Sequence, residues 1–204
     1  MKPVVIHRLW MDTAASSQHL NRALPLPLQM KIYINNGFTG LVDKILISSC
    51  LLGQPVRYDG QSKAVKNVII NNWLAEGRLV TICPEISGGL PVPRPAAEQQ
   101  GLADEILTGA SIVKTEDDKD VSPYFLRGAQ HALDLCRQEK IQLAILKENS
   151  PSCGSTQVYD GSFSQKLIPG AGITTTLLRR NGITVFNEFE IDKAAEHIAA
   201  LSAC

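Results

Sequence analysis

The sequence predicts one α/β domain built on a mostly parallel sheet that helices cover on both faces. Two observations lead to this prediction. Short, unbroken apolar runs of strand length recur along the chain, as in KILISS and IQLAIL, and such runs are typical of strands buried on both faces. Segments with helical signals separate these runs, and this alternation favours parallel strands joined by helical crossovers.

Taken in order, the regular alternation begins at Lys44. The expected strands cover residues 44–49, 79–82, 110–113, 141–147 and 183–186. The strand at 110–113 is the least regular of them and is read as a short or edge strand. Each of the others is an apolar run that ends in polar or glycine-rich residues, as buried parallel strands do.

Helices are expected at residues 62–76, 96–105, 122–139, 172–180 and 191–200. Gly77 ends the first of them, and Asn181-Gly182 ends the fourth. Ser122-Pro123 begins the third, with Ser122 as the N-cap and a proline at the first helical position. The glycine- and proline-rich stretch 88–95 cannot be helical, because its prolines have fixed backbone angles.

Residues 1–43 differ from the rest of the chain, because no period of 2 or 3.6 residues persists in them. We expect a poorly ordered N-terminal extension over 1–43, followed by the α/β domain over 44–204. Because KILISSC makes a natural first strand, we also hypothesise that the native start lies near Val42 and that the extension is a start-site artefact.

Composition limits the function classes. Of 204 residues, 44% are hydrophobic, and 20 Lys and Arg balance 20 Asp and Glu. A net charge near zero argues against a nucleic-acid partner, which normally requires a basic face. No apolar stretch approaches the roughly 20 residues of a membrane-spanning helix. Five cysteines without an export signal favour reduced thiols and a cytoplasmic location.

Three of the five cysteines lie beside loop-forming residues that follow an apolar run. Cys50, Cys83 and Cys153 each come where a predicted strand ends, so neighbouring parallel strands would gather them at the carboxyl edge of the sheet, where open α/β sheets bind ligands. Three soft ligands there suit an iron–sulfur cluster or zinc. Their spacing matches no local metal motif, so three buried, unliganded thiols remain equally open from spacing alone.

The other two cysteines carry less chemistry. Cys136 falls on the apolar stripe of the predicted helix at 122–139, so we expect it to pack as a small hydrophobic side chain. Cys204 is the last residue, where chains fray, and we expect no role for it.

Five motifs carry a resemblance to a known family. They are SSCLLGQPVRYDG, CPEISGGLPVPRP, LKENSPSCG, YDGSF and PGAGITTTLLRRNGI. Together, and in this order, they resemble the DUF523 family, whose characterised members are TudS-type thiouracil desulfidases. The resemblance covers residues 44–186. It implies a Rossmann-like α/β domain with a [4Fe–4S] cluster held by three cysteines, which by motif are Cys50, Cys83 and Cys153, with the fourth iron free of protein ligands.

The resemblance also implies catalytic residues and a substrate. The catalytic carboxylate falls on Glu85, and the catalytic serine falls on Ser150, with Ser152 as the alternative. The substrate is then a small thiolated nucleobase such as 2-thiouracil, converted to uracil and sulfide. A cluster-dependent sulfur transferase and a non-enzymatic iron–sulfur or zinc protein are the rival readings.

Two further features admit both a functional and a structural reading. Arg94 lies in the proline-rich loop and can bind an anion or a base carbonyl, or pair with a protein carboxylate. Pro169-Gly170-Ala171-Gly172 precedes a predicted helix. It can hold an anion at the helix N-terminus or form a plain turn.

Overall fold

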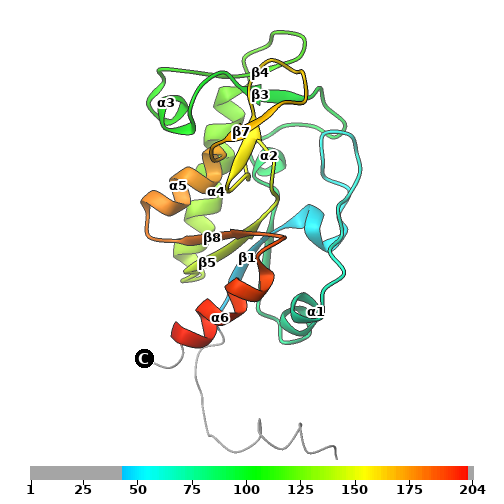
Figure 1. Cartoon of the computed structure of the whole chain (residues 1–204), viewed down its shortest axis with the longest axis vertical. Coiled ribbons are helices and arrows are strands. Elements are labelled where there is room, and N and C mark those ends of the chain that lie inside the picture. The colour runs from blue at the N-terminus through cyan, green and yellow to red at the C-terminus, as the bar shows by residue number, and fades with distance from the viewer. Residues whose placement is uncertain (1–42, 202–204) are drawn as a thin grey trace, which may run out of the picture. The chain divides into compact units, whose positions relative to one another are not determined.

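A four-stranded parallel sheet in the order β2-β1-β5-β8 lies at the centre of the fold (Figure 1). The computed structural model describes residues 43–201, which belong to the unit Leu41–Cys204. The strands are β1 (Ile45–Ser48), β2 (Leu79–Ile82), β5 (Leu143–Leu146) and β8 (Thr184–Asn187). The central strands β1 and β5 are buried at every position, as expected of strands with both faces covered.

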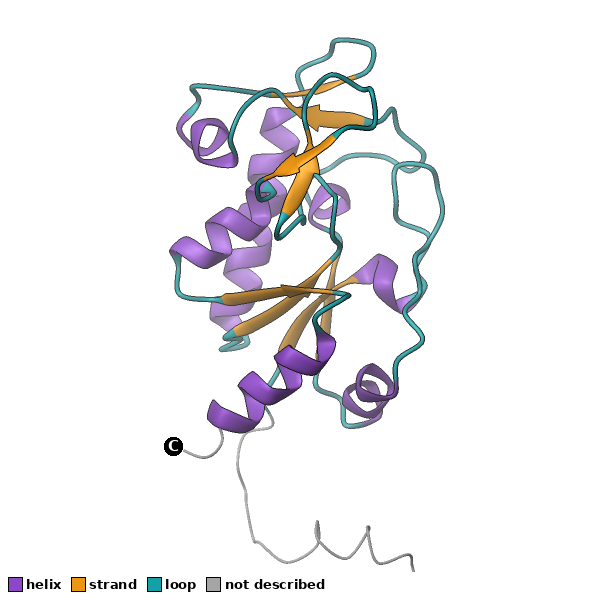
Figure 2. Cartoon of the chain, viewed as in Figure 1, coloured by secondary structure: helices purple, strands orange, loops and turns teal. Residues whose placement is uncertain are grey.

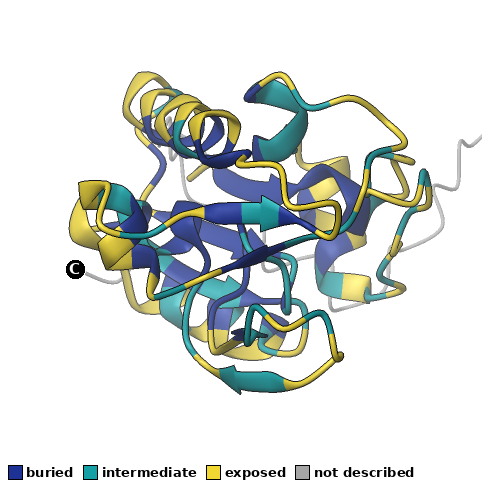
Figure 3. Ribbon diagram, turned by 90° about the horizontal axis from the view of Figure 1, so that it is seen from above, coloured by how far each residue is buried: buried dark blue, intermediate teal, exposed yellow. Residues whose placement is uncertain are grey.

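Helices form a layer on each face of this sheet (Figure 2). These are α4 (Ser122–Gln138) and α5 (Ile173–Arg180) on one face, and α1 (Val68–Ala75) and α6 (Ile191–Leu201) on the other. Within β1, Leu46 packs in one core with Leu133 and Leu178, whereas Ile45 packs in the other core with Trp73 and Ile198. The period-2 alternation of a strand thus feeds two separate cores, and burial is concentrated in the strands between the helix layers (Figure 3).

Two antiparallel ribbons lie outside the central sheet. They are β3 (Ala97–Gln99) with β4 (Val113–Thr115), and β6 (Gln157–Tyr159) with β7 (Leu167–Pro169). Three short helices complete the described elements, namely the 3₁₀-helix η2 (Ser49–Leu52), α2 (Pro84–Ser87) and α3 (Ala103–Thr108). A third apolar core around Phe125 joins α3, β4 and the N-terminal halves of α4 and α5.

These elements confirm the predicted α/β class, a three-layer fold around a parallel sheet. The apolar runs at 44–49, 79–82, 141–147 and 183–186 are its four strands, and the last three predicted helices begin and end within two residues of α4, α5 and α6. The N-cap of α4 is Val121 rather than Ser122. The Ser122 hydroxyl accepts from the Val113 amide at 2.8 Å and donates to Asp120.

The first predicted helix, at 62–76, is wrong over its first half. Residues 61–67 have no regular secondary structure, and the amides of Lys63 and Val65 donate to the carbonyls of Cys50 and Leu51 instead of forming a helix. The helix α1 begins only after Asn67, whose side chain accepts from the amide of Ile69 at 2.8 Å. Contact with η2 therefore overrides the local helical preference.

The region 96–115 also differs from the prediction. Part of the helix expected at 96–105 is the strand β3, and α3 starts only at Ala103; the strand expected at 110–113 is β4, which begins at Val113. Pairing of Glu98 with Lys114 across the ribbon fixes this register. The β6–β7 ribbon was not predicted, since its three-residue strands carry too short a pattern to detect.

The predicted N-terminal extension, residues 1–43, lies outside the described residues apart from Asp43, so it stays a prediction, as does the start-site hypothesis. Within residues 43–201, no helix is both long enough and apolar enough to cross a membrane.

Candidate active site at the carboxyl end of the sheet

The carboxyl ends of three neighbouring strands deliver the three predicted cysteines to one cavity. Cys50 lies in η2 directly after β1, Cys83 follows β2, and Cys153 lies in the loop after β5. All three line a cavity of about 760 Å³, whose other wall is formed by the two ribbons and the loop 160–165. The sheet edge expected from the sequence is therefore the place where the thiols meet.

The segment after β1 holds Cys50 by its backbone. The carbonyl of Cys50 accepts from the amides of Gly53 and Lys63, at 3.2 and 2.9 Å. Gly53 ends η2 with φ of +90°, a backbone conformation that glycine adopts without strain. Cys50 is thereby fixed with its side chain buried at the cavity wall.

The next segment places Cys83 and Glu85 within one helical turn. Cys83 is the N-cap of α2, Pro84 is its first residue, and Glu85 lies in its first turn. This turn packs directly on α4, where a Cβ at Gly128 would overlap the carbonyl of Pro84. Close backbone contact between α2 and α4 thus determines the position of Cys83 and Glu85 relative to the sheet.

The Cys153 loop is held by backbone donors from α5. The amides of Ile173 and Thr174 donate to the carbonyls of Pro151 and Ser152, at 3.1 and 2.9 Å, and Gly172 donates to Gly154 at 2.8 Å. The first-turn amides of α5 are therefore engaged by protein. The Pro169–Gly172 stretch thus has a structural role. The amides of this first turn are not available to bind an anion.

Glu148 anchors the other end of the same loop. Its buried carboxylate accepts from the amides and hydroxyls of Ser155 and Thr156 and from the amide of Gln157, at 2.7 to 3.0 Å. Burial alone would raise the pKa of Glu148, but these hydrogen bonds outweigh it and hold the pKa below its usual value. Glu148 therefore acts as an ionised structural anchor.

The thiols lie close enough to influence one another electrostatically. Burial, and then the neighbouring Cys83, raise the pKa of Cys50 to about 11, while Lys147 and Arg57 act in the opposite direction. Burial likewise raises the pKa of Cys83 and of Cys153, and Cys83 and Cys50 add to the effect on Cys153. These groups are neutral thiols until a metal stabilises their ionised form.

The donor set fits a cluster better than a single ion. Among residues 43–201, no three Cys, His, Asp or Glu side chains converge tightly enough to hold one metal ion. A cluster makes a different demand, because each cysteine ligates a different iron and the sulfurs surround the whole cluster. Three free thiols from three loops around one cavity meet that demand.

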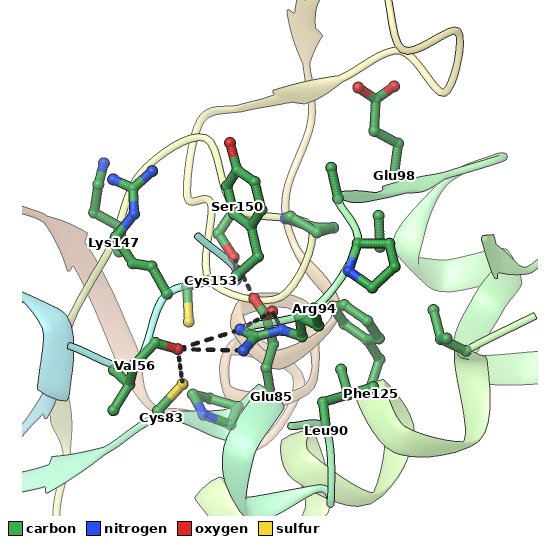
Figure 4. Close-up of a pocket in the computed structure, with 18 of the residues that line it drawn as sticks. Val56, Cys83, Glu85, Leu90, Arg94, Glu98, Phe125, Lys147, Ser150 and Cys153 are labelled. Atoms are coloured by element: carbon green, nitrogen blue, oxygen red, sulfur yellow. Dashed lines mark hydrogen bonds and ion pairs between the residues drawn. The ribbon is translucent and has the colours of Figure 1, made fainter. Parts of the chain in front are cut away.

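Glu85 lies beside these thiols between two polar partners (Figure 4). Its Oε2 accepts from Arg94 Nη2 at 2.6 Å and from Arg94 Nε at 3.1 Å, and its Oε1 accepts from the Ser150 hydroxyl at 3.3 Å. The Ser150 oxygen in turn accepts from the amides of Ser152 and Cys153, at 3.1 and 3.2 Å. Glu85 and Ser150 thus form a hydrogen-bonded pair at the cavity wall.

The two candidate serines occupy different places. Ser150 lines the cavity, whereas Ser152 is fully buried behind the loop, and its hydroxyl shares a 2.8 Å hydrogen bond with Thr174 of α5. The expectation that Cys136 packs as a hydrophobic side chain is confirmed: it is 1% exposed within the core under α4. Cys204 lies outside the described residues.

Sequence reasoning missed several polar residues of the cavity. Ser48 donates to the sulfur of Cys153 at 3.7 Å and accepts from the amide of Lys147. Glu98 reaches the far wall, where it accepts from the amide of Phe163 at 3.0 Å. Ser48 was within reach of prediction, because it precedes Cys50 by two positions. Glu98 could not be predicted in this way, because the sequence predicts a helix over residues 96–105.

An α/β domain with three free thiols at one cavity and an adjacent carboxylate–serine pair has the arrangement expected of a cysteine-ligated metalloprotein with a reactive cavity. Comparison with known proteins gives the family. The chain belongs to the 2-thiouracil desulfurase family, whose profile matches residues 45–190. The resemblance inferred from the five motifs is thereby confirmed.

Two known proteins illustrate this likeness. The uncharacterized protein YbbK of Bacillus subtilis (strain 168) is 39% identical over 149 residues, which are 72% of this chain and 97% of YbbK. A solved structure described as the [4Fe-4S]-dependent thiouracil desulfidase TudS is 49% identical, with a TM-score of 0.72, and the match covers 78% of this chain and 99% of that one.

Proposed function

We propose that this protein is a [4Fe–4S]-dependent desulfidase that converts a thiolated pyrimidine such as 2-thiouracil into uracil and sulfide. The observation that carries the proposal is the meeting of Cys50, Cys83 and Cys153 with Glu85 and Ser150 at one cavity. Membership of the 2-thiouracil desulfurase family and the TudS likeness support the same activity.

Cys50, Cys83 and Cys153 would hold the cluster, each as a thiolate. When bound, the cluster supplies one iron without a protein ligand, a soft Lewis acid suited to accept sulfide. Lys147 and Arg57, which line the cavity on the Cys50 side, favour the ionised form of Cys50 through their positive charge. The Ser48 hydroxyl steadies the Cys153 sulfur by its hydrogen bond.

Glu85 and Ser150 carry the proton chemistry in this proposal. The oxygen of one water forms the new bond to the thiocarbonyl carbon, the carbon–sulfur bond breaks, and the two water protons leave with the sulfur as hydrogen sulfide. Glu85 takes a proton from the water at Oε1 and passes it to the departing sulfur, directly or by way of a ring nitrogen. Ser150, hydrogen-bonded to the same oxygen, positions the water, or attacks the ring carbon itself, in which case the water then breaks the carbon–serine bond, gives uracil and restores the hydroxyl. Ser152 holds the loop through Thr174.

The cavity suits a small substrate. Its volume of about 760 Å³ falls within the range of small-molecule sites, on the order of 300–1,000 Å³. Formal net charge is zero, so we propose a small-molecule partner rather than a nucleic acid. We further propose a cytoplasmic location, since the four described cysteines are free and cluster ligation requires reduced thiols.

Anaerobic purification, followed by iron and acid-labile sulfide analysis and a 2-thiouracil turnover assay, tests this proposal. We expect about four irons per chain, as a [4Fe–4S] cluster requires, together with stoichiometric uracil and sulfide. A cluster without turnover of any thiolated base would instead favour the storage or sensor reading. Sulfur delivered to a second molecule, with no free sulfide, would favour a transferase.

A further inference from the structure

Arg94 makes as many side-chain hydrogen bonds as Glu148, five each, and both residues line the cavity. The Arg94 side chain is only 5% exposed. The guanidinium group has five N–H donors, and the structure gives it five hydrogen bonds, at 2.6 to 3.3 Å, to Glu85 and to the carbonyls of Val56 and Pro91. Every donor is matched by a protein acceptor, so none is left for a substrate.

These contacts join three segments of the chain: the segment after η2, the short helix α2 and the proline-rich loop. Val56 follows the Cys50 helix, Glu85 follows Cys83, and Pro91 belongs to the proline-rich loop of Arg94 itself. The Val56 carbonyl also lies 3.9 Å from the Cys83 sulfur, and Figure 4 shows Arg94 reaching both this carbonyl and Glu85. Movement of any one segment would therefore break contacts at Arg94.

The same contacts determine how Glu85 is presented. Arg94 Nε and Nη2 both donate to Oε2, while Oε1 accepts from Ser150 alone among residues 43–201. The planar, rigid guanidinium fixes the carboxylate orientation in a way that a single ammonium group cannot. One carboxylate oxygen is thereby held back from the reaction, and the other is aimed at Ser150 and the cavity.

We propose that Arg94 is a positioning residue that fixes the carboxylate of Glu85 in its reactive orientation. This inference deepens the proposed function and rests on it for its kinetic consequence. Arg94 acts through Glu85 and does not touch the substrate. Its removal should therefore lower kcat and leave KM nearly unchanged, because binding of the ring does not use the guanidinium.

The experiment compares Arg94→Ala, Arg94→Lys and Glu85→Gln, each reconstituted anaerobically. We expect the loaded Arg94→Ala to lose on the order of 10²-fold in kcat, the scale of a misplaced reactive group, with little change in KM. Millimolar guanidinium should restore part of the kcat of Arg94→Ala and none of that of Glu85→Gln. A double variant that combines Arg94→Ala with Glu85→Gln should turn over no more slowly than Glu85→Gln alone, since Arg94 acts through the carboxylate that this protein lacks.

Arg127→Ala is the matched control. Arg127 donates to the carbonyl of Gly88 in the same loop, at 3.1 Å, and stacks on Tyr124, but it does not touch Glu85. It should keep its kcat. Should Arg94→Ala fail to assemble a cluster, Arg94→Lys is the test, because lysine keeps the charge but cannot reproduce the two-nitrogen contact. A wild-type kcat in either loaded variant, or independent losses that multiply in the double variant, would overturn the proposal.

A crystal structure of Arg94→Lys separates this inference from the proposed function. We expect the Glu85 carboxylate to turn away from Ser150 even if the protein does not act on thiouracil. An unmoved Glu85 would refute the positioning role, whereas a moved Glu85 in a protein without any desulfidase activity would refute only the proposed reaction.

Discussion

A single methyl group added at Gly172 should force the Cys153 loop away from the start of α5. Gly172 is the N-cap of α5 with φ of −74°, a backbone conformation open to alanine. An added Cβ would lie 2.7 Å from the Cys153 amide nitrogen and nearer still to the Ser152 carbonyl. Ordinary contact begins at about 3.5 Å, so the loop and the helix would have to separate by roughly 1 Å.

Four backbone hydrogen bonds join the loop to this end of α5: three of 2.8 to 3.1 Å from Gly172, Ile173 and Thr174, and a longer one of 3.4 Å from Thr175. Weakening them at about 1 kcal/mol each predicts that Gly172→Ala loses roughly 2–4 kcal/mol of unfolding free energy. For a protein of this size, the loss corresponds to a fall in Tm of about 5–10 °C. Cluster content should fall as well, because Cys153 moves with the loop.

Thermal unfolding of the metal-free protein and iron analysis of the reconstituted protein measure both effects. Gly170→Ala is the control, since its Cβ would meet one side-chain methyl of Val158 at 3.0 Å and no backbone. A Gly172→Ala protein with unchanged Tm and full iron content would show that the loop is not held against α5 as described.

Three further predictions concern the site. Changing Cys50, Cys83 or Cys153 to alanine should abolish cluster content, whereas Cys136→Ala should keep it and lose only about 1 kcal/mol of stability; comparable iron loss in all four would contradict this division. Loaded Glu85→Gln and Ser150→Ala should retain the cluster but lose about 10²-fold or more in turnover, and Ser152→Ala should lose less; full activity of Glu85→Gln would point to another proton carrier. The pKa of Glu148 is lower in the folded protein than its ordinary value of 4.5. Glu148 therefore stabilises the fold above pH 4.5, and this stabilisation is lost as the pH falls through the pKa of the folded protein. Acid unfolding should therefore be less steep in Glu148→Gln, which at neutral pH should be about 3 kcal/mol less stable; an unchanged acid transition would refute the anchoring role.

The sequence predicts those parts of the fold whose signal is local. Continuous apolar runs identify β1, β2, β5 and β8, because a strand buried on both faces needs apolar residues at every position. The same runs predict that three cysteines lie at one edge of the sheet, and this prediction does not require knowing which residues surround them. Residues 61–67 and β3 were misread because their conformation depends on pairing with distant backbone, which no local pattern encodes.

Some features of the candidate site are likewise predictable from local sequence, and others depend on the folded chain. Motifs indicate which residue types meet, but the contact of Arg94 with Glu85 depends on how the proline-rich loop folds back over α2. The sequence alone predicts equally that Arg94 binds a ligand or that it pairs with a protein carboxylate. Only the full set of its hydrogen bonds decides for the carboxylate.

The origin of the three thiols in separate segments has a consequence for the lifetime of the protein. Cys50, Cys83 and Cys153 lie 33 and 70 positions apart in the chain, so cysteines sharing one cluster would act as cross-links between β1, β2 and β5. By analogy with a disulfide, closing loops of such lengths removes chain entropy from the unfolded state worth about 3.5–4.5 kcal/mol each. Iron supply would then control degradation as well as activity, because a chain deprived of iron loses these cross-links and unfolds more readily to proteases.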